Sequence, residues 1–255
     1  MTLKHRLLVE SGNILKIGIP ITIAQLLNIS MSFVDTVMTG NYSAEALAAV
    51  SGGVRFIMPF QLFGVATIGA AHAITAQYVG SGKDKTEIGR VTLHSLLIGL
   101  AFSLFLIFLT RLAPMVLPFF GFKESIIEIA KSYLFAFSFG LPAVMIFVGF
   151  TGFYAGISKP VITMFISIIM LLVNIVGNYT LIFGNFGFPE LGAEGAGWTS
   201  SLASWSGALG VIAISLINRE IRKYRALRLR FNPSSKLFAG ILKIGIPSGF
   251  STVFE

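Results

Sequence analysis

Residues 14–20 read ILKIGIP, and residues 241–247 repeat the same seven residues in the same order. The two copies are offset by 227 residues, and they enclose six long hydrophobic stretches. An even number of membrane crossings returns a chain to the side from which it started, so both copies would enter a membrane in the same direction. The repeat therefore predicts two parallel halves related by an axis along the membrane normal.

The composition is that of a membrane protein. Hydrophobic residues make up 55% of the 255 residues, charged residues 12%, and the mean hydropathy is +0.83. Soluble domains carry about 25% charged residues, so this chain has too little polar surface to cover a water-exposed globule. Soluble, disordered, secreted and nucleic-acid-binding proteins are excluded as classes. The chain has no cysteine, which excludes disulfides and thiolate metal sites, and it shows no motif of an enzyme or of a cofactor site.

Six stretches are long enough to cross a hydrocarbon core of about 30 Å as helices, since each helical residue adds about 1.5 Å. We predict spans over residues 14–38, 54–79, 91–110, 133–153, 160–183 and 195–217, and the start of a seventh near Leu237.

These spans predict an all-α membrane protein with a first lobe over residues 1–218, a basic linker over 219–236 and the start of a second lobe over 237–255. A second half of equal length would give about 450 residues and twelve helices, so we expect the sequence to be one full half followed by a fragment of the other.

Basic residues predict the orientation. Of the 19 lysines and arginines, 15 lie in the N-terminal segment or in the second, fourth and sixth connections. Cytoplasmic loops carry the excess of lysine and arginine, so the N-terminus and the basic linker are expected in the cytoplasm. The net charge of +8 is then an orientation signal rather than a sign of an anionic partner.

Polar residues inside the spans mark a candidate site. Asp35 lies about 8 Å below the outer end of the first span, Asn178 and Asn174 lie about 8 and 14 Å below the outer end of the fifth, and Thr199 and Ser200 lie about one turn inside the sixth. A carboxylate among amide and hydroxyl oxygens is typical of a site for a hard monovalent cation or a proton. Alternatively, Asp35 is an interfacial helix-end residue, and the two asparagines only hold helices together.

Several short motifs, in the right order along all six spans, are similar to those of the multidrug and toxic compound extrusion (MATE) family, in its NorM-like branch. They are FVDT at 33–36 with Gly40, then Ala76, Gln77, Gly80 and Gly82 in the second connection, Gly156, Lys159 and Pro160 before the fifth span, Asn174 and Asn178 within it, and PELG at 189–192 with Gly195 and Gly197 before the sixth.

The resemblance implies a twelve-span, two-lobe antiporter of the cytoplasmic membrane that exports cationic amphipathic drugs against inward Na⁺ or H⁺. It implies that Asp35 is the essential carboxylate of this lobe, and that Asn174 and Asn178 occupy the cation-site positions. Another branch has aspartate at the position of Asn178, so the match does not extend to a two-carboxylate site. Glu255 resembles a seventh-span glutamate, so Na⁺ is expected either at Asp35, Asn174 and Asn178 or at Glu255.

The expected partners are cationic amphipathic small molecules, membrane lipid and the second lobe, without nucleic acid. One rival function is a flippase for lipid-linked oligosaccharides from the same superfamily, which a cavity ringed by arginine and lysine would favour. Rivals of another class are a passive channel and a structural membrane protein, which would not move substrate against a gradient.

Overall fold

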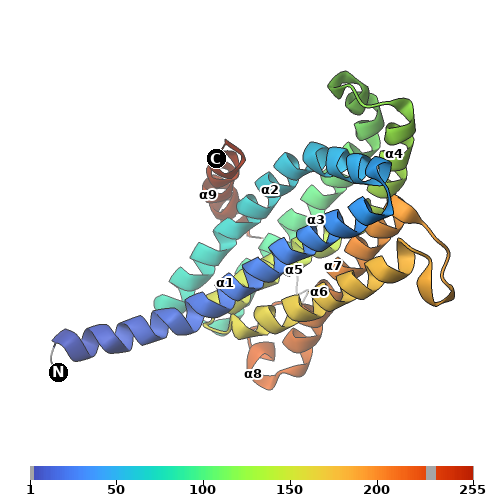
Figure 1. Ribbon diagram of the computed structural model, residues 1–255. Coiled ribbons are helices and arrows are strands. Elements are labelled where there is room, and N and C mark those ends of the chain that lie inside the picture. The colour runs from blue at the N-terminus through green and yellow to red at the C-terminus, as the bar shows by residue number, and fades with distance from the viewer. Residues whose placement is uncertain (1–2, 228–233, 255) are drawn as a thin grey trace.

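The computed structural model of the chain describes residues 3–227 and 234–254, and all regular structure in those ranges is helical (Figure 1). The α-helices are α1 (Leu3–Tyr42), α2 (Ala44–Gly80), α3 (Lys85–Val116), α4 (Glu124–Ser138), α5 (Leu141–Gly156), α6 (Val161–Leu181), α7 (Gly192–Ile217), α8 (Arg219–Arg222) and α9 (Ser235–Phe254), with short 3-10 turns at Leu117–Phe120 and Asn185–Gly187.

Six of the helices are long and apolar enough to cross a membrane, and the pair α4 and α5 passes the same test as one bent span. The seven crossings are then α1, α2, α3, the pair α4 and α5, α6, α7 and α9. This confirms the predicted fold class, six spans followed by a further helix. Most helices extend beyond the predicted hydrophobic stretch, because polar turns at the membrane surfaces continue the backbone hydrogen bonding of the span.

The fourth span is where the prediction was wrong. A single helix over 133–153 was expected, but α4 and α5 meet at an angle of 46° around Phe139 and Gly140. A side chain at Gly140 would collide with the backbone of Ser201 in α7, and Pro142 stands in the first turn of α5, where its missing N–H is tolerated. Hydropathy depends on composition and not on the direction of the helix axis, so a hydropathy profile cannot predict the bend.

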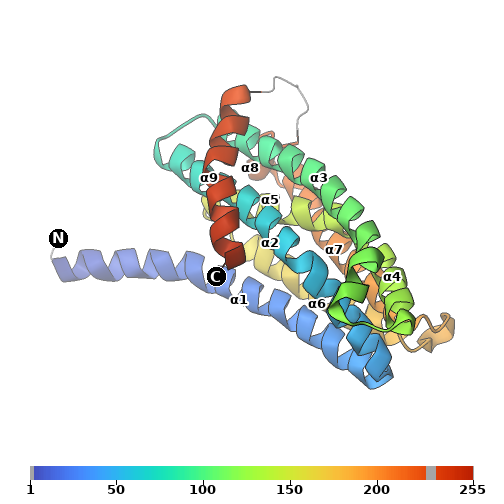
Figure 2. The same ribbon diagram turned by 90° about the horizontal axis from the view of Figure 1, so that it is seen from above.

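The helices form one packed bundle. α2 packs against α3, α4, α5 and α9, while α6 pairs with α7 and α1 lies along α6 (Figures 1 and 2). Glycines allow α7 to approach its neighbours closely, since Gly195 faces the backbone of Leu181 and Gly197 faces the backbone of Tyr133. Small residues at helix contacts are the usual device in membranes, where association depends on close van der Waals packing.

The last described helix is fastened to the preceding bundle. The Thr67 hydroxyl of α2 donates to the Gly245 carbonyl of α9 at 3.3 Å, and the rings of Phe63 and Phe250 pack edge to face with centroids 5.1 Å apart. The predicted linker contains α8, and its residues 228–233 lie outside the described residues. The proposed division at 218 and 236 stays a prediction.

Candidate cation-binding site

The Asp35 carboxylate of α1 receives hydrogen bonds from two other helices. The Asn174 and Asn178 side-chain amides of α6 donate to Oδ1 at 2.8 and 2.6 Å, and the Ser200 hydroxyl of α7 donates to Oδ2 at 3.1 Å. Three residues that are distant in sequence from Asp35 therefore converge on one carboxylate. The structure thus brings together four of the six residues that the sequence singled out.

Local helix geometry explains this convergence. Asn174 and Asn178 are four residues apart on α6, so both amides lie on one face, and both side chains are fully buried. Asp35 is half-buried, and its backbone carbonyl accepts a hydrogen bond of 2.7 Å from the buried Thr39 hydroxyl one turn later. Gly177 lets α7 approach α6, because a Cβ there would stand only 2.7 Å from the methyl group of Thr199.

The oxygens around the carboxylate are not saturated. Asn178 Oδ1 is buried and has no hydrogen-bond partner among the described residues, and Asn174 Oδ1 receives one long bond of 3.4 Å from Asn178. An ionised carboxylate only accepts hydrogen bonds, so it turns both amide NH₂ groups toward itself and leaves the amide oxygens without strong donors. A buried acceptor without a donor costs about 1–3 kcal/mol. A cation would satisfy these oxygens together with the carboxylate.

Two predicted site residues stand apart from this group. The Thr199 hydroxyl is buried against Gly177 and has no hydrogen-bond partner among the described residues, so it does not bond the carboxylate as its neighbour Ser200 does. Glu255 lies outside the described residues, which end with Phe254 of α9.

Sequence reasoning missed two residues beside Asp35. Thr39 bonds the Asp35 backbone, and the buried Tyr133 of α4 belongs to an apolar cluster against which Met38, three residues after Asp35, packs. The signal for Thr39 was the four-residue spacing from Asp35. Tyr133 carried no signal, because the approach of α4 to α1 depends on tertiary packing.

The chemistry of the site is that of one carboxylate among neutral ligands. Within the ranges that the structure describes, no lysine or arginine forms an ion pair with Asp35, and no three His, Cys, Asp or Glu side chains gather as they would around a transition metal. A single negative charge with amide and hydroxyl oxygens suits a monovalent cation or a proton better than a multivalent metal.

Curated proteins similar to this chain are multidrug resistance proteins. The MatE family model matches residues 20–180. The chain is 32% identical over 246 residues to the multidrug resistance protein NorM of Photobacterium profundum, covering 96% of this chain and 54% of that protein. It is 34% identical over 250 residues to a probable multidrug resistance protein NorM of Listeria monocytogenes, covering 94% and 53%. The chain therefore spans about half the length of the curated relatives it matches.

Solved structures share the fold. A MATE transporter of Vibrio cholerae in a bent form superimposes with a TM-score of 0.83 at 17% identity, covering 95% of this chain and 54% of that one. A MOP superfamily transporter of Pyrococcus furiosus gives a TM-score of 0.80 at 23% identity, covering 94% and 52%. The six-span bundle with its additional helix corresponds to about half of each of these structures.

Proposed function

Because this chain belongs to the MATE family of transporters, which are not enzymes, we propose that it forms one lobe of a cation-coupled multidrug exporter in which Asp35 binds the coupling cation. The observation that carries this proposal is the Asp35 carboxylate, held by three neutral donors from α6 and α7 with no basic partner among the described residues. A structural carboxylate in a membrane is expected to be neutralised by a basic residue, whereas a cation carrier must keep its charge available.

The coupling step follows from the charge of the site. An inward cation gains about 2.3 kcal/mol per 100 mV of membrane potential, and a proton gains about 1.4 kcal/mol per unit of pH difference. Binding of Na⁺ or H⁺ neutralises Asp35 and weakens the three hydrogen bonds that tie α1 to α6 and α7. The occupied and empty states of the site therefore favour different positions of α1, which links cation binding to a change in the shape of the lobe.

The proposed substrates are cationic amphipathic compounds, and the proposed coupling ion is Na⁺ or H⁺. The support for the substrate class is the multidrug resistance activity in the names of the relatives. A cationic drug and the coupling cation would both be attracted by the Asp35 carboxylate, so binding of one favours release of the other. This exchange requires a second lobe to complete the cleft, so we expect residues 1–255 alone to confer no drug resistance and co-expression with a second lobe to restore it.

The decisive experiment compares Asp35→Asn with Asp84→Asn in the assembled two-lobe protein. Asparagine keeps the size of Asp35 but cannot bind and release a cation, so gradient-driven drug export in everted vesicles is expected to disappear. Asp84 is exposed, and its side chain caps no helix, so its substitution is the matched control and should leave export unchanged. Gradient-driven export retained by a folded Asp35→Asn protein would show that Asp35 is not the carrier.

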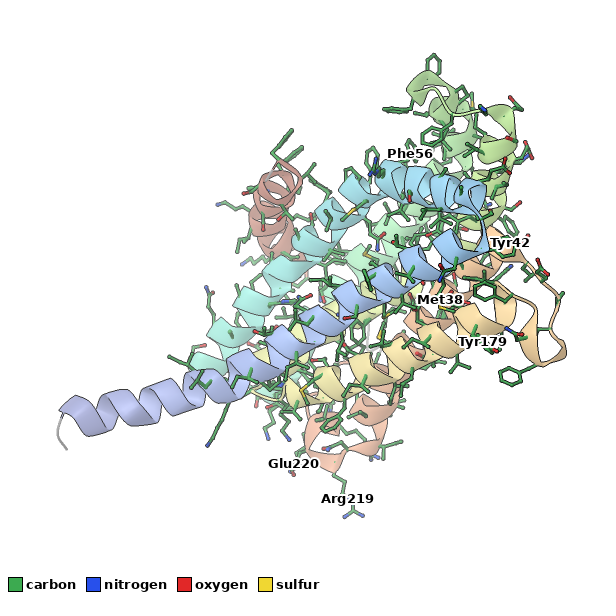
Figure 3. All side chains as sticks on the ribbon, in the orientation of Figure 1. Met38, Tyr42, Phe56, Tyr179, Arg219 and Glu220 are labelled. Carbon is green, nitrogen blue, oxygen red and sulfur yellow. The ribbon has the colours of Figure 1, made fainter. Side chains whose placement is uncertain are left out.

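The proposed orientation places the N-terminus in the cytoplasm. Tyr42 and Tyr179 lie at one end of the bundle, and Arg219 and Glu220 lie far from them toward the other (Figure 3). The chain lacks cysteine, so single cysteines at Asn185 and Ser234 can be labelled selectively. An impermeant thiol reagent is expected to reach position 185 from outside the cell and position 234 only from inside. The reverse pattern would invert the orientation.

A further inference from the structure

Arg111 is an arginine inside a membrane span without a carboxylate partner among the described residues. It lies on α3, about 8 Å before the end of that helix at Val116. Its guanidinium lies over the ring of Phe135, 4.6 Å from the centroid, and its only hydrogen bond to a described residue is a long one of 3.4 Å to the Ser138 hydroxyl. An arginine at this depth is costly, so it needs a polar partner or a route to the headgroups.

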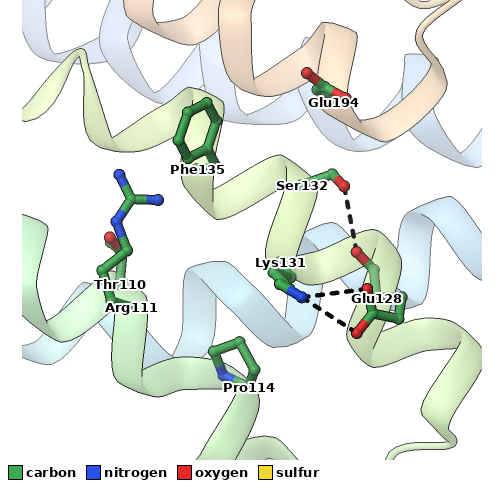
Figure 4. Close-up of a pocket in the computed structure, with 8 residues that line it drawn as sticks. All are labelled: Thr110, Arg111, Pro114, Glu128, Lys131, Ser132, Phe135 and Glu194. Atoms are coloured by element: carbon green, nitrogen blue, oxygen red, sulfur yellow. Dashed lines mark hydrogen bonds and ion pairs between the residues drawn. The ribbon is translucent and has the colours of Figure 1, made fainter.

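The Arg111 side chain borders a cavity of about 370 Å³ between α3, α4 and α7 (Figure 4). Charges of both signs line this cavity, which we call the headgroup cavity. Lys131 forms an ion pair of 3.5 Å with Glu128, and Glu194 Oε1 accepts a hydrogen bond of 3.1 Å from the Trp198 indole. Lys131 and Glu128 balance each other, so Arg111 and Glu194 remain as one cation and one anion that are not paired with an opposite charge among the described residues.

Aromatic residues place the headgroup cavity at the membrane surface. The Phe139 and Trp198 rings stack with centroids 5.2 Å apart, Phe135 packs edge-on against both, and the Trp205 indole donates to the Phe139 carbonyl at 2.9 Å. Phe135 and Phe139 are exposed, as is Phe119 beyond the end of α3. Tryptophans gather where hydrocarbon meets headgroups, and Trp198 bonds Glu194 in the cavity lining, so we infer that the cavity faces lipid at headgroup level.

We propose that the headgroup cavity binds a zwitterionic phospholipid with a primary ammonium, as in phosphatidylethanolamine, with its phosphate on Arg111 and its ammonium at Glu194. The planar guanidinium suits two oxygens of one phosphate, and the Glu194 carboxylate accepts hydrogen bonds from an ammonium. A lipid with only a negative charge leaves Glu194 unmatched, and a quaternary ammonium has no N–H to donate. The bound lipid would join α3, α4 and α7 near the end of α7 that carries Ser200. The proposal does not depend on the transport activity.

The test measures which lipids the purified chain retains. The 255-residue protein is equilibrated with vesicles of phosphatidylethanolamine, phosphatidylglycerol and phosphatidylcholine in equal amounts, and bound lipids are counted by native mass spectrometry. Phosphatidylethanolamine should be retained in preference to the other two. Arg111→Gln should lower its retention about tenfold, because a charge-assisted phosphate contact is lost. The matched control is Lys123→Gln, a cation near the start of α4 that does not line the cavity, and it should behave as the wild type.

A second pair of variants separates lipid recognition from a general effect on folding. Arg111→Lys keeps the charge but loses the two-pronged geometry, so its retention should be intermediate. Glu194→Gln keeps the acceptor for the Trp198 indole but removes the negative charge, so the preference should shift from phosphatidylethanolamine toward phosphatidylglycerol. No change of preference in Glu194→Gln, or retention by Arg111→Gln equal to the wild type, would overturn the proposal. Displacement of the lipid by equimolar inorganic phosphate would also overturn it, since the cavity would then be a site for free phosphate.

Discussion

Two buried polar clusters at different levels of the bundle are built in opposite ways. In the half of the bundle that the proposed orientation places outward, which we call the outer half, the ionisable Asp35 carboxylate accepts from the Asn178 amide and leaves Asn178 Oδ1 without a donor among the described residues. In the opposite half, which we call the inner half, the buried Tyr154 hydroxyl donates to the Val211 carbonyl at 2.8 Å and shares a hydrogen bond of 2.7 Å with the Ser215 hydroxyl. The inner cluster is neutral and its hydrogen bonds are satisfied, whereas the outer cluster contains an ionisable carboxylate and has an amide oxygen without a donor among the described residues.

This difference separates a contact that holds helices together from one that can bind a ligand. Tyr154 connects α5 to α7 amid the packed rings of Phe150 and Phe153, and nothing in that cluster changes if an ion arrives. Asp35 connects α1 to α6 and α7 through bonds that depend on its charge state. Substitutions in the inner cluster should therefore change stability, and substitutions in the outer cluster should change cation binding.

The largest effect is expected for the double substitution Asn174→Leu and Asn178→Leu. It removes the two amide oxygens that would bind Na⁺ beside the Asp35 carboxylate, Asn178 Oδ1 and Asn174 Oδ1. If each contact contributes about 1.4 kcal/mol, the Na⁺ concentration that gives half-maximal export by the two-lobe protein should rise about a hundredfold. Ser167→Ala is the matched control on α6, because its buried hydroxyl has no hydrogen-bond partner among the described residues. An unchanged cation dependence would show that the two asparagines only hold helices together.

Tyr154→Phe is expected to have the opposite profile. The ring is kept, but the Val211 carbonyl and the Ser215 hydroxyl lose their partner inside the bundle. The free energy of unfolding should fall by about 1–3 kcal/mol, with no change in cation dependence. Thermal unfolding in detergent measures the first quantity, and Tyr179→Phe, at an exposed position, is the control that should not shift the transition. A changed cation dependence in Tyr154→Phe would contradict the separation of the two clusters.

Regular helix geometry made the Asp35 cluster predictable, since depth and spacing alone place Asn174, Asn178 and Asp35 at one level. The same arithmetic could not choose between Thr199 and Ser200. Successive helical residues point about 100° apart, so only one of the two can face the carboxylate, and the rotation of α7 decides which. That rotation depends on the close contacts of α7 with α6 and α4.

The bend between α4 and α5 and the headgroup cavity could likewise not be predicted from the sequence. Gly140 and Pro142 are tolerated in straight membrane helices as well as in bent ones, so their presence does not predict an angle. Arg111, Phe135 and Glu194 come from three helices with no shared spacing, and only the packed bundle brings them to one cavity. Family resemblance contributed the expected roles of residues, which stay predictions, while their contacts required the structure.

His94→Phe should have a smaller effect than the substitutions in either polar cluster, and it should change only local stability. His94 Nδ1 donates to the Arg90 carbonyl at 2.7 Å, so Nε2 is the acceptor that receives the Ser234 backbone N–H at the start of α9. Phenylalanine keeps the edge-to-face contact with Phe238 but removes this capping bond, which should cost about 1 kcal/mol. Faster amide hydrogen exchange confined to the start of α9 is the expected signature. Unchanged exchange there would show that packing on Phe238 is sufficient.

The smallest effect on stability is expected for Glu220→Gln. This substitution tests whether an exposed carboxylate, unlike the half-buried Asp35, can be neutralised without a change in the unfolding temperature. Glu220 of α8 is exposed and pairs with Lys223 at 2.6 Å, and this hydrogen bond lowers the pKa of Glu220. A lowered pKa means that the ion pair contributes above the ordinary pKa of glutamate and that the contribution is lost as the pH falls through the lowered value. Exposed pairs are screened by water and salt, so wild type and Glu220→Gln should unfold at the same temperature at neutral pH and in acid. A drop in the unfolding temperature of Glu220→Gln at neutral pH, absent in acid, would show instead that this pair stabilises the α8 turn that follows α7.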